Sequence, residues 1–148
     1  MILISFLLDG ILSIYLYKLI PLFTLTSIVI ASYYKKADSL IKYTVLIGIL
    51  YDVVYTNTII LNSIIFFFLS LLLIKLNKKF NKNYFNILFI NTIIITLYLV
   101  VTYIILVLFN YLNFNIIYMT ISILKSLIIN NIYISFLYLI MHKKRFYA

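Results

Sequence analysis

The chain has 148 residues, of which 66% are hydrophobic and only 10% are charged, and its mean hydropathy is +1.20. These values exclude an ordinary water-soluble domain of this length and predict one polytopic membrane domain over residues 1–148. There is no cysteine, and the single histidine, His142, lies at the last expected membrane boundary. The parts of a thiolate or histidine metal site and of a nucleophile–base pair are therefore missing. We predict that the protein is not an enzyme, with no catalytic residue, metal or cofactor.

The positive charge of the chain is concentrated in short clusters. The formal net charge of +9 would suggest a nucleic-acid partner in a soluble protein. Here the basic clusters separate apolar stretches, which is typical of cytoplasmic loops that follow the positive-inside rule, so no nucleic acid is expected. Ten of the twelve basic residues form three clusters: Lys35, Lys36 and Lys42; Lys75, Lys78, Lys79 and Lys82; Lys143, Lys144 and Arg145.

The first apolar stretch runs from Met1 to about Tyr34. As one helix it would measure about 50 Å, against about 30 Å for the hydrocarbon core of a bilayer. Two short helices fit better, with a break near Lys18 and Pro21, because proline is tolerated at a helix start. We expect this hairpin to be the least regular part of the fold. A third helix should follow the first basic cluster and end near Tyr55.

Three further helices are expected in the second half of the chain. A polar turn at 56–58 leads into a fourth helix that should end near Lys75. The hydrophilic loop 77–83 precedes a fifth helix from about Tyr84 to Phe109, and an uncharged turn precedes a sixth that should end near Met141. The prediction is an all-α membrane protein with six transmembrane helices.

The distribution of the basic residues indicates the orientation of these spans. If the N-terminus is cytoplasmic, all three basic clusters lie inside and the turn at Lys18 lies outside. The positive-inside rule therefore selects a multi-pass protein of the plasma membrane with both termini in the cytoplasm.

Two residues of opposite charge, Asp9 and Lys125, lie within predicted spans. Each costs about 2.5 to 3.5 kcal/mol at a helix centre unless it finds a partner, water or a route to the interface. Counting about 1.5 Å per residue puts both near the membrane midplane. We hypothesise a buried ion pair between them, which would either fix the packing of the first and last helices or take part in ligand or proton binding.

The third charged residue expected inside a span, Asp52, lies four residues before the predicted outer turn, where interfacial water is within reach. Gly48 lies one turn away on the same helix face, and glycine allows a neighbouring helix to approach closely. Asn62, on the returning helix, is placed to donate a hydrogen bond to the carboxylate. The spacing predicts a close contact between two helices with a carboxylate acceptor at its edge.

The run from Gly48 to Asn62 (GILYDVVYTNTIILN) also resembles the hairpin of the rod shape-determining protein MreD family. In that family a glycine is followed four residues later by an aspartate, a short polar turn and a helix that opens with a Leu-Asn or similar pair. The segments 8–10 and 21–25 are similar to members from Gram-positive bacteria. Ile60 departs from the pattern, since relatives usually carry glycine there.

The resemblance implies a non-catalytic membrane subunit of the bacterial cell-elongation (rod) machinery. It implies binding to the single-span protein MreC and a larger complex with MreB, RodA and a class-B penicillin-binding protein. It also implies a fold similar to the substrate-binding (S) subunits of energy-coupling-factor transporters. Gly48, Asp52, Asn57 and Asn62 would then shape a pocket or partner groove open to the outer leaflet. The alternative is a vitamin-binding subunit of such a transporter, with polar residues of this set lining its cavity.

Overall fold

The structure is a computed structural model. It describes the backbone of residues 1–15, 21–56 and 60–146 and, within these, all side chains except those of residues 14, 15, 56 and 142–146. Over these ranges the chain is helical and contains no strand, which confirms the predicted all-α class. The elements are α1 (Ile2–Tyr15), α2 (Phe23–Ser32), α3 (Ala37–Tyr51), the π-helical segment η1 (Asp52–Thr56), α4 (Leu61–Lys79), α5 (Tyr84–Leu108) and α6 (Ile116–Phe146).

Among the described residues, three helices are long and apolar enough to cross a membrane, namely α4, α5 and the part of α6 from Ile116 to Met141. The 14 residues of α1 and the 10 of α2 give lengths of only about 21 and 15 Å, short of the ~30 Å of a bilayer core. The predicted break between two short helices is therefore present. Lys18 lies outside the described residues.

The predicted helix boundaries are accurate at some ends and wrong at others. The third helix, counted through η1, ends at Thr56, and α5 covers Tyr84–Leu108, both within one residue of the prediction. The predicted ends at Lys75 and Met141 are too early, because α4 continues to Lys79 and α6 to Phe146. Lysine has a good helix propensity, and its long side chain lets a helix continue into the interface.

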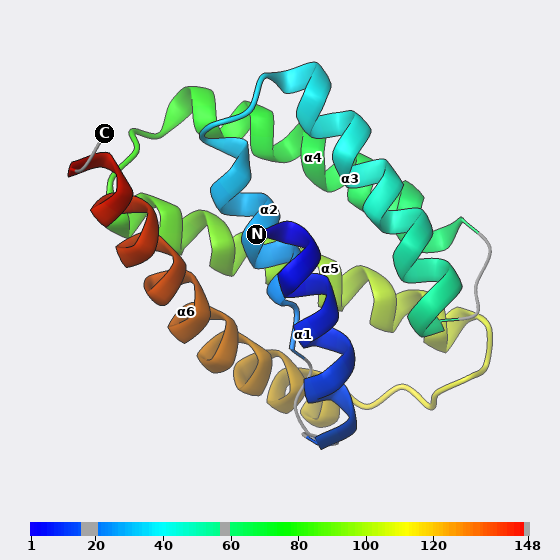
Figure 1. Cartoon of the computed structure of the whole chain (residues 1–148). Helices are drawn as coiled ribbons and strands as arrows, with labels where there is room; N and C mark the ends of the chain where they lie inside the picture. The colour runs from blue at the N-terminus through cyan, green and yellow to red at the C-terminus, as the bar shows by residue number, and fades with distance from the viewer. Residues whose placement is uncertain (16–20, 57–59, 147–148) are drawn as a thin grey trace.

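The short helix α2 lies at the centre of the bundle and packs against all five other helices (Figure 1). Every side chain from Phe23 to Ala31 is buried, including those of Thr24, Thr26 and Ser27. A helix that is covered on all sides needs no amphipathic pattern. Around it, α3 pairs with α4 and α5 pairs with α6 as antiparallel neighbours.

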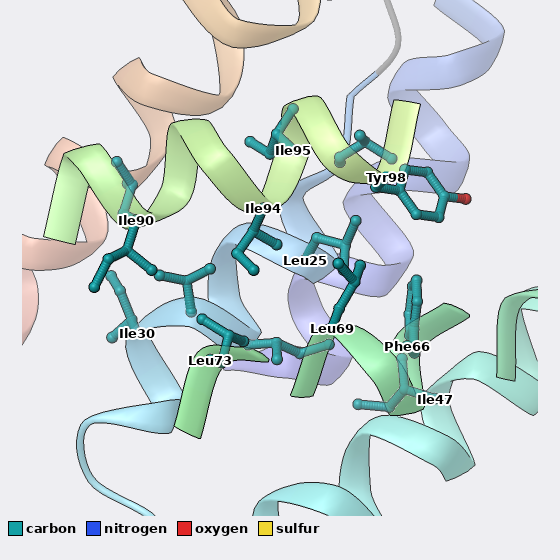
Figure 2. Close-up of a cluster of buried hydrophobic side chains, with 14 of the residues drawn as sticks. Leu25, Ile30, Ile47, Phe66, Leu69, Leu73, Ile90, Ile94, Ile95 and Tyr98 are labelled. Atoms are coloured by element: carbon teal, nitrogen blue, oxygen red, sulfur yellow. The ribbon is translucent and has the colours of Figure 1, made fainter. Parts of the chain in front are cut away.

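The hydrophobic core fills the space where α2, α4 and α5 meet. Figure 2 shows Leu25 and Ile30 of α2, Leu69 and Leu73 of α4, and Ile90, Ile94 and Ile95 of α5 in this space, with Ile47, Phe66 and Tyr98 nearby. The outer surface is also apolar: Leu3, Phe68, Phe85 and Ile117 are each more than 60% exposed. A surface of this kind suits lipid as the surrounding solvent.

Candidate functional site

The contact between α3 and α4 is centred on Gly48. A Cβ atom at this position would lie 2.5 Å from the Cα atom and 2.9 Å from the backbone nitrogen of Ser63. Both distances are far below van der Waals contact, and both are to backbone rather than to a side chain that could move. The two helix backbones therefore touch at Gly48, and glycine is required there.

Asp52 follows one turn later, at the start of η1, and is 2% exposed. Its Oδ1 accepts hydrogen bonds from the backbone nitrogen and the Nδ2 of Asn62, both at 2.9 Å. Its Oδ2 accepts bonds from the backbone nitrogen and the Oγ of Ser63, both at 3.1 Å. The first N–H groups of a helix have no partner within the helix, and a carboxylate there also interacts favourably with the helix dipole. Asp52 thus caps α4 from the preceding helix.

Asn62 extends this network to a third helix. Its Oδ1 accepts a 2.8 Å hydrogen bond from the hydroxyl of Tyr98 on α5, and both side chains are buried. The series Asp52–Asn62–Tyr98 therefore connects the α3–α4 hairpin to α5. Buried polar groups that satisfy one another in this way hold helices in a defined arrangement.

The structure therefore brings Gly48, Asp52 and Asn62 together, with Asn62 donating to Asp52. Asn57, the fourth residue of the hypothesised pocket or groove, lies outside the described residues. The role of this set in binding a partner or a small molecule stays a prediction. Tyr98 was not anticipated, because one tyrosine among fifteen carries no distinguishing signal in the sequence.

Ile60 precedes α4 in the left-handed region, with φ of 74°. This conformation brings Asn62 and Ser63 under the Asp52 carboxylate. It is unfavourable for an L-residue and most of all for a β-branched one, whereas glycine adopts it freely. Ile60, where the resemblance predicts glycine, therefore has a backbone conformation that favours glycine.

A second buried aspartate performs the same task in the first hairpin. Asp9 of α1 is 3% exposed, and its two carboxylate oxygens accept bonds from the backbone nitrogens of Phe23 (2.7 Å) and Thr24 (2.9 Å). The preceding N–H, that of Leu22, donates to Oδ1 of Asn130 on α6 at 3.0 Å. The start of the central helix is thus capped by α1 and α6 together.

The predicted ion pair between Asp9 and Lys125 is absent from the described part of the chain. Lys125 is exposed on α6, whereas the Asp9 carboxylate points to the start of α2. Counting residues along the helices gives the depth of Asp9 and Lys125 in the membrane but not which face of α6 meets α1. Asn130 of α6 reaches the start of α2, and it also donates to the backbone oxygen and the Oγ of Ser126. In the sequence, the polar residues Ser126 and Asn130 at i, i+4 spacing within a predicted span could have indicated a buried polar contact on this face of α6.

The third hairpin has a neutral version of the same arrangement. Asn115 immediately precedes α6, and its backbone nitrogen donates to the hydroxyl oxygen of Tyr103 on α5 at 2.7 Å. The side chain of Asn115 accepts a bond from the backbone nitrogen of Tyr118 at 3.1 Å. In all three hairpins, then, a side chain of the first helix bonds backbone N–H at the start of the second.

A separate apolar cavity of about 510 Å³ lies between the start of α1 and the face of α3 from Tyr43 to Leu50. The start of α1, the end of α2, one face of α3 and Met141 line it, with Lys35 as its charged group. Among the described residues, no group of three or more histidines or acids could hold a metal ion.

These features define a class: an all-helical membrane protein whose buried carboxylates cap its own helices. Comparison with known proteins narrows the class further. A family model described as rod shape-determining protein MreD matches residues 1–145 of the 148. The chain belongs to the MreD family, which supports a role in determining cell shape. No curated protein and no solved structure matches, so the expected likeness to transporter S subunits has no support from these comparisons.

Proposed function

We propose that this protein is a non-catalytic subunit of the bacterial rod complex. It binds the single-span protein MreC and, with MreB, RodA and a class-B penicillin-binding protein, helps to organise lateral peptidoglycan synthesis. The observation that carries the proposal is the family match over residues 1–145. The use of the buried acids agrees with a structural role, because Asp9 and Asp52 both accept hydrogen bonds from helix N-termini.

The same proposal includes six membrane crossings with both termini in the cytoplasm. The α4–α5 connection and the C-terminal end of α6 lie at one end of the bundle, and the α5–α6 connection lies at the other (Figure 1). The α4–α5 connection and the C-terminal end of α6 carry basic residues, whereas the α5–α6 connection carries none, which agrees with the positive-inside rule if the first end is cytoplasmic. The short α2 fits this topology because its buried start receives acceptors from Asp9 and Asn130 instead of water.

A vitamin-binding subunit would need a polar cavity that opens to the outside. The Asp52 carboxylate accepts hydrogen bonds from the side chains of Asn62 and Ser63, and the Asn62 amide oxygen accepts one from Tyr98. The 510 Å³ cavity has an almost entirely apolar lining, and Asp52, Asn62 and Tyr98 are not among its lining residues. Both observations favour the interaction protein over the small-molecule binder.

Affinity purification from native membranes tests the proposal, with an unrelated multi-pass protein as control bait. We expect recovery of a single-span protein with an extracytoplasmic coiled coil, together with a polymerase and a penicillin-binding protein, and loss of rod shape when the chain is depleted. Recovery of two ATPases and a membrane coupling subunit, in cells that keep their shape after depletion, would contradict it and favour the vitamin-binding alternative.

A further inference from the structure

Lys125 occupies an unusual position for a charged residue. It lies within Ile116–Met141, one of the three helical segments long enough to cross a membrane, and its side chain is exposed on α6. Nine residues separate it from the start of the helix, which places it about 13 Å along the axis. Ionisable residues inside membrane spans are rare and almost always face protein or a water-filled cavity. Lys125 instead faces outward from this chain.

The surface around Lys125 is a continuous apolar stripe. Residues spaced by three or four positions lie on one face of a helix, so Lys125 falls among the exposed side chains of this stripe. α6 is also the least covered of the three long helices: 22% of its span is buried, against 39% for α4 and for α5. The stripe consists of Ile117, Ile121, Leu124, Ile128, Ile132, Phe136 and Leu139, all of which are more than 40% exposed.

The chain itself supplies no counter-charge for Lys125. It contains three acidic residues in total. Asp9 and Asp52 are buried and bonded to helix N-termini, and Asp38 lies in the first turn of α3, next to the basic Lys35–Lys36 pair. A second copy of the chain would bring the same three acids in the same places. An ion-pair partner must therefore come from another molecule.

We propose that the α6 stripe centred on Lys125 is the docking surface for a transmembrane helix of a different protein, which carries an aspartate or glutamate at the depth of Lys125. The apolar residues of the stripe provide van der Waals packing, and the carboxylate satisfies the lysine within the bilayer. This inference rests on the proposed function, since the helix that fits is the single span of a complex partner.

Photo-crosslinking in native membranes tests the surface. p-Benzoylphenylalanine replaces Ile128 in the stripe or, as a matched control, Phe68, which is exposed to a similar extent on α4. We expect position 128 to crosslink the single-span partner and position 68 to leave it unlabelled. Equal labelling from both positions, or adducts with a second copy of this chain alone, would overturn the proposal.

Variants of Lys125 test the charge. We expect Lys125→Met to lower recovery of the partner at least fivefold, whereas Lys125→Arg retains it, as does Lys75→Met, which removes an exposed lysine from α4. Because the side chain faces away from the bundle, the thermal stability of the purified Lys125→Met protein should equal that of the wild type. Lys125→Glu should also lose the partner, and recovery should return when one acid in the partner's span is changed to lysine, because the ion pair is then restored with reversed charges.

The two proposals fail in different ways. If the wild-type chain recovers no single-span partner, the proposed function fails and this inference fails with it. If the wild type recovers the partner and Lys125→Met recovers it equally well, the proposed function stands and the docking surface is wrong. In that case the lysine reaches lipid phosphates at the interface instead.

Discussion

The α1–α2 and α3–α4 hairpins each use a buried aspartate to cap their second helix, but they differ in how far that cap depends on other helices. In each, a buried aspartate accepts N–H groups from the start of the next helix, and in a bilayer no water can replace it. Asp52 also receives two side-chain donors from residues only ten and eleven positions away. Asp9 bonds residues fourteen and fifteen positions away, and Asn130 of the last helix completes the cap. The described donors to Asp52 thus come from its own hairpin, which the hydrogen bond between Asn62 and Tyr98 links to α5, whereas the cap at the start of α2 also needs an acceptor from α6.

Removing each carboxylate tests this comparison most strongly. Asp52→Ala leaves at least four buried donors without an acceptor and should lower the free energy of unfolding by about 3 to 5 kcal/mol. Asp9→Ala loses the two backbone hydrogen bonds from Phe23 and Thr24 and should cost about 2 to 3 kcal/mol. Reversible unfolding in mixed micelles measures both values. Asp38→Ala, an exposed acid, serves as control and should change stability by less than about 1 kcal/mol. A larger loss for Asp9→Ala than for Asp52→Ala would reverse the ranking.

The two glycines of the chain give a matched test of backbone contact. Gly48→Ala puts a methyl group against the backbone of Ser63 and should cost about 2 to 3 kcal/mol. Gly10→Ala meets the hydroxyl end of the Tyr55 side chain rather than backbone, so a side-chain shift can accommodate it, and it should cost less than Gly48→Ala, about 1 kcal/mol. Thermal unfolding of fluorescent-protein fusions, followed by size exclusion, separates the two variants. Equal melting temperatures would rule out the tight α3–α4 contact.

Asn130→Ala tests the dependence of the first hairpin on α6. The variant loses the acceptor for the Leu22 N–H and should cost about 1 to 2 kcal/mol. Hydrogen–deuterium exchange should accelerate at the start of α2 and stay unchanged at Asn62 and Ser63. Faster exchange at both hairpins would show that they are not independent.

Ile60→Gly is expected to change stability least among these substitutions, and it is the only one expected to stabilise the protein. The left-handed backbone at Ile60 costs about 1 to 2 kcal/mol in an L-residue, and glycine removes that cost. Part of the gain is lost to the greater freedom of glycine in the unfolded chain, which leaves about 0.5 to 1 kcal/mol. Ile64→Gly, an exposed site inside α4, is the control and should destabilise. A lower melting temperature for Ile60→Gly would count against the strained conformation.

The sequence predicted local features better than the rotation of helices about their axes. The all-α class, the break in the first apolar stretch and the Gly48–Asp52–Asn62 proximity follow from composition and from spacings within one hairpin. The Asp9–Lys125 pair failed because depth and opposite charge do not determine which face of α6 meets α1. Asn130, which does bond the start of α2, carries no distinguishing signal by itself because asparagine is frequent in this sequence. The membership in the MreD family came from the same hairpin motif and is confirmed by the match over residues 1–145.

The central claim is that the Asp52 carboxylate stabilises the fold by holding the start of α4 against the preceding helix. The most direct measurement combines the melting temperature of purified Asp52→Ala with the shape of cells that carry it as their only copy. We expect a large loss of thermal stability together with rounded cells, and partial recovery of both when Ile60→Gly is added. Normal thermal stability with rounded cells would contradict the claim, because Asp52 would then act in recognition rather than in packing.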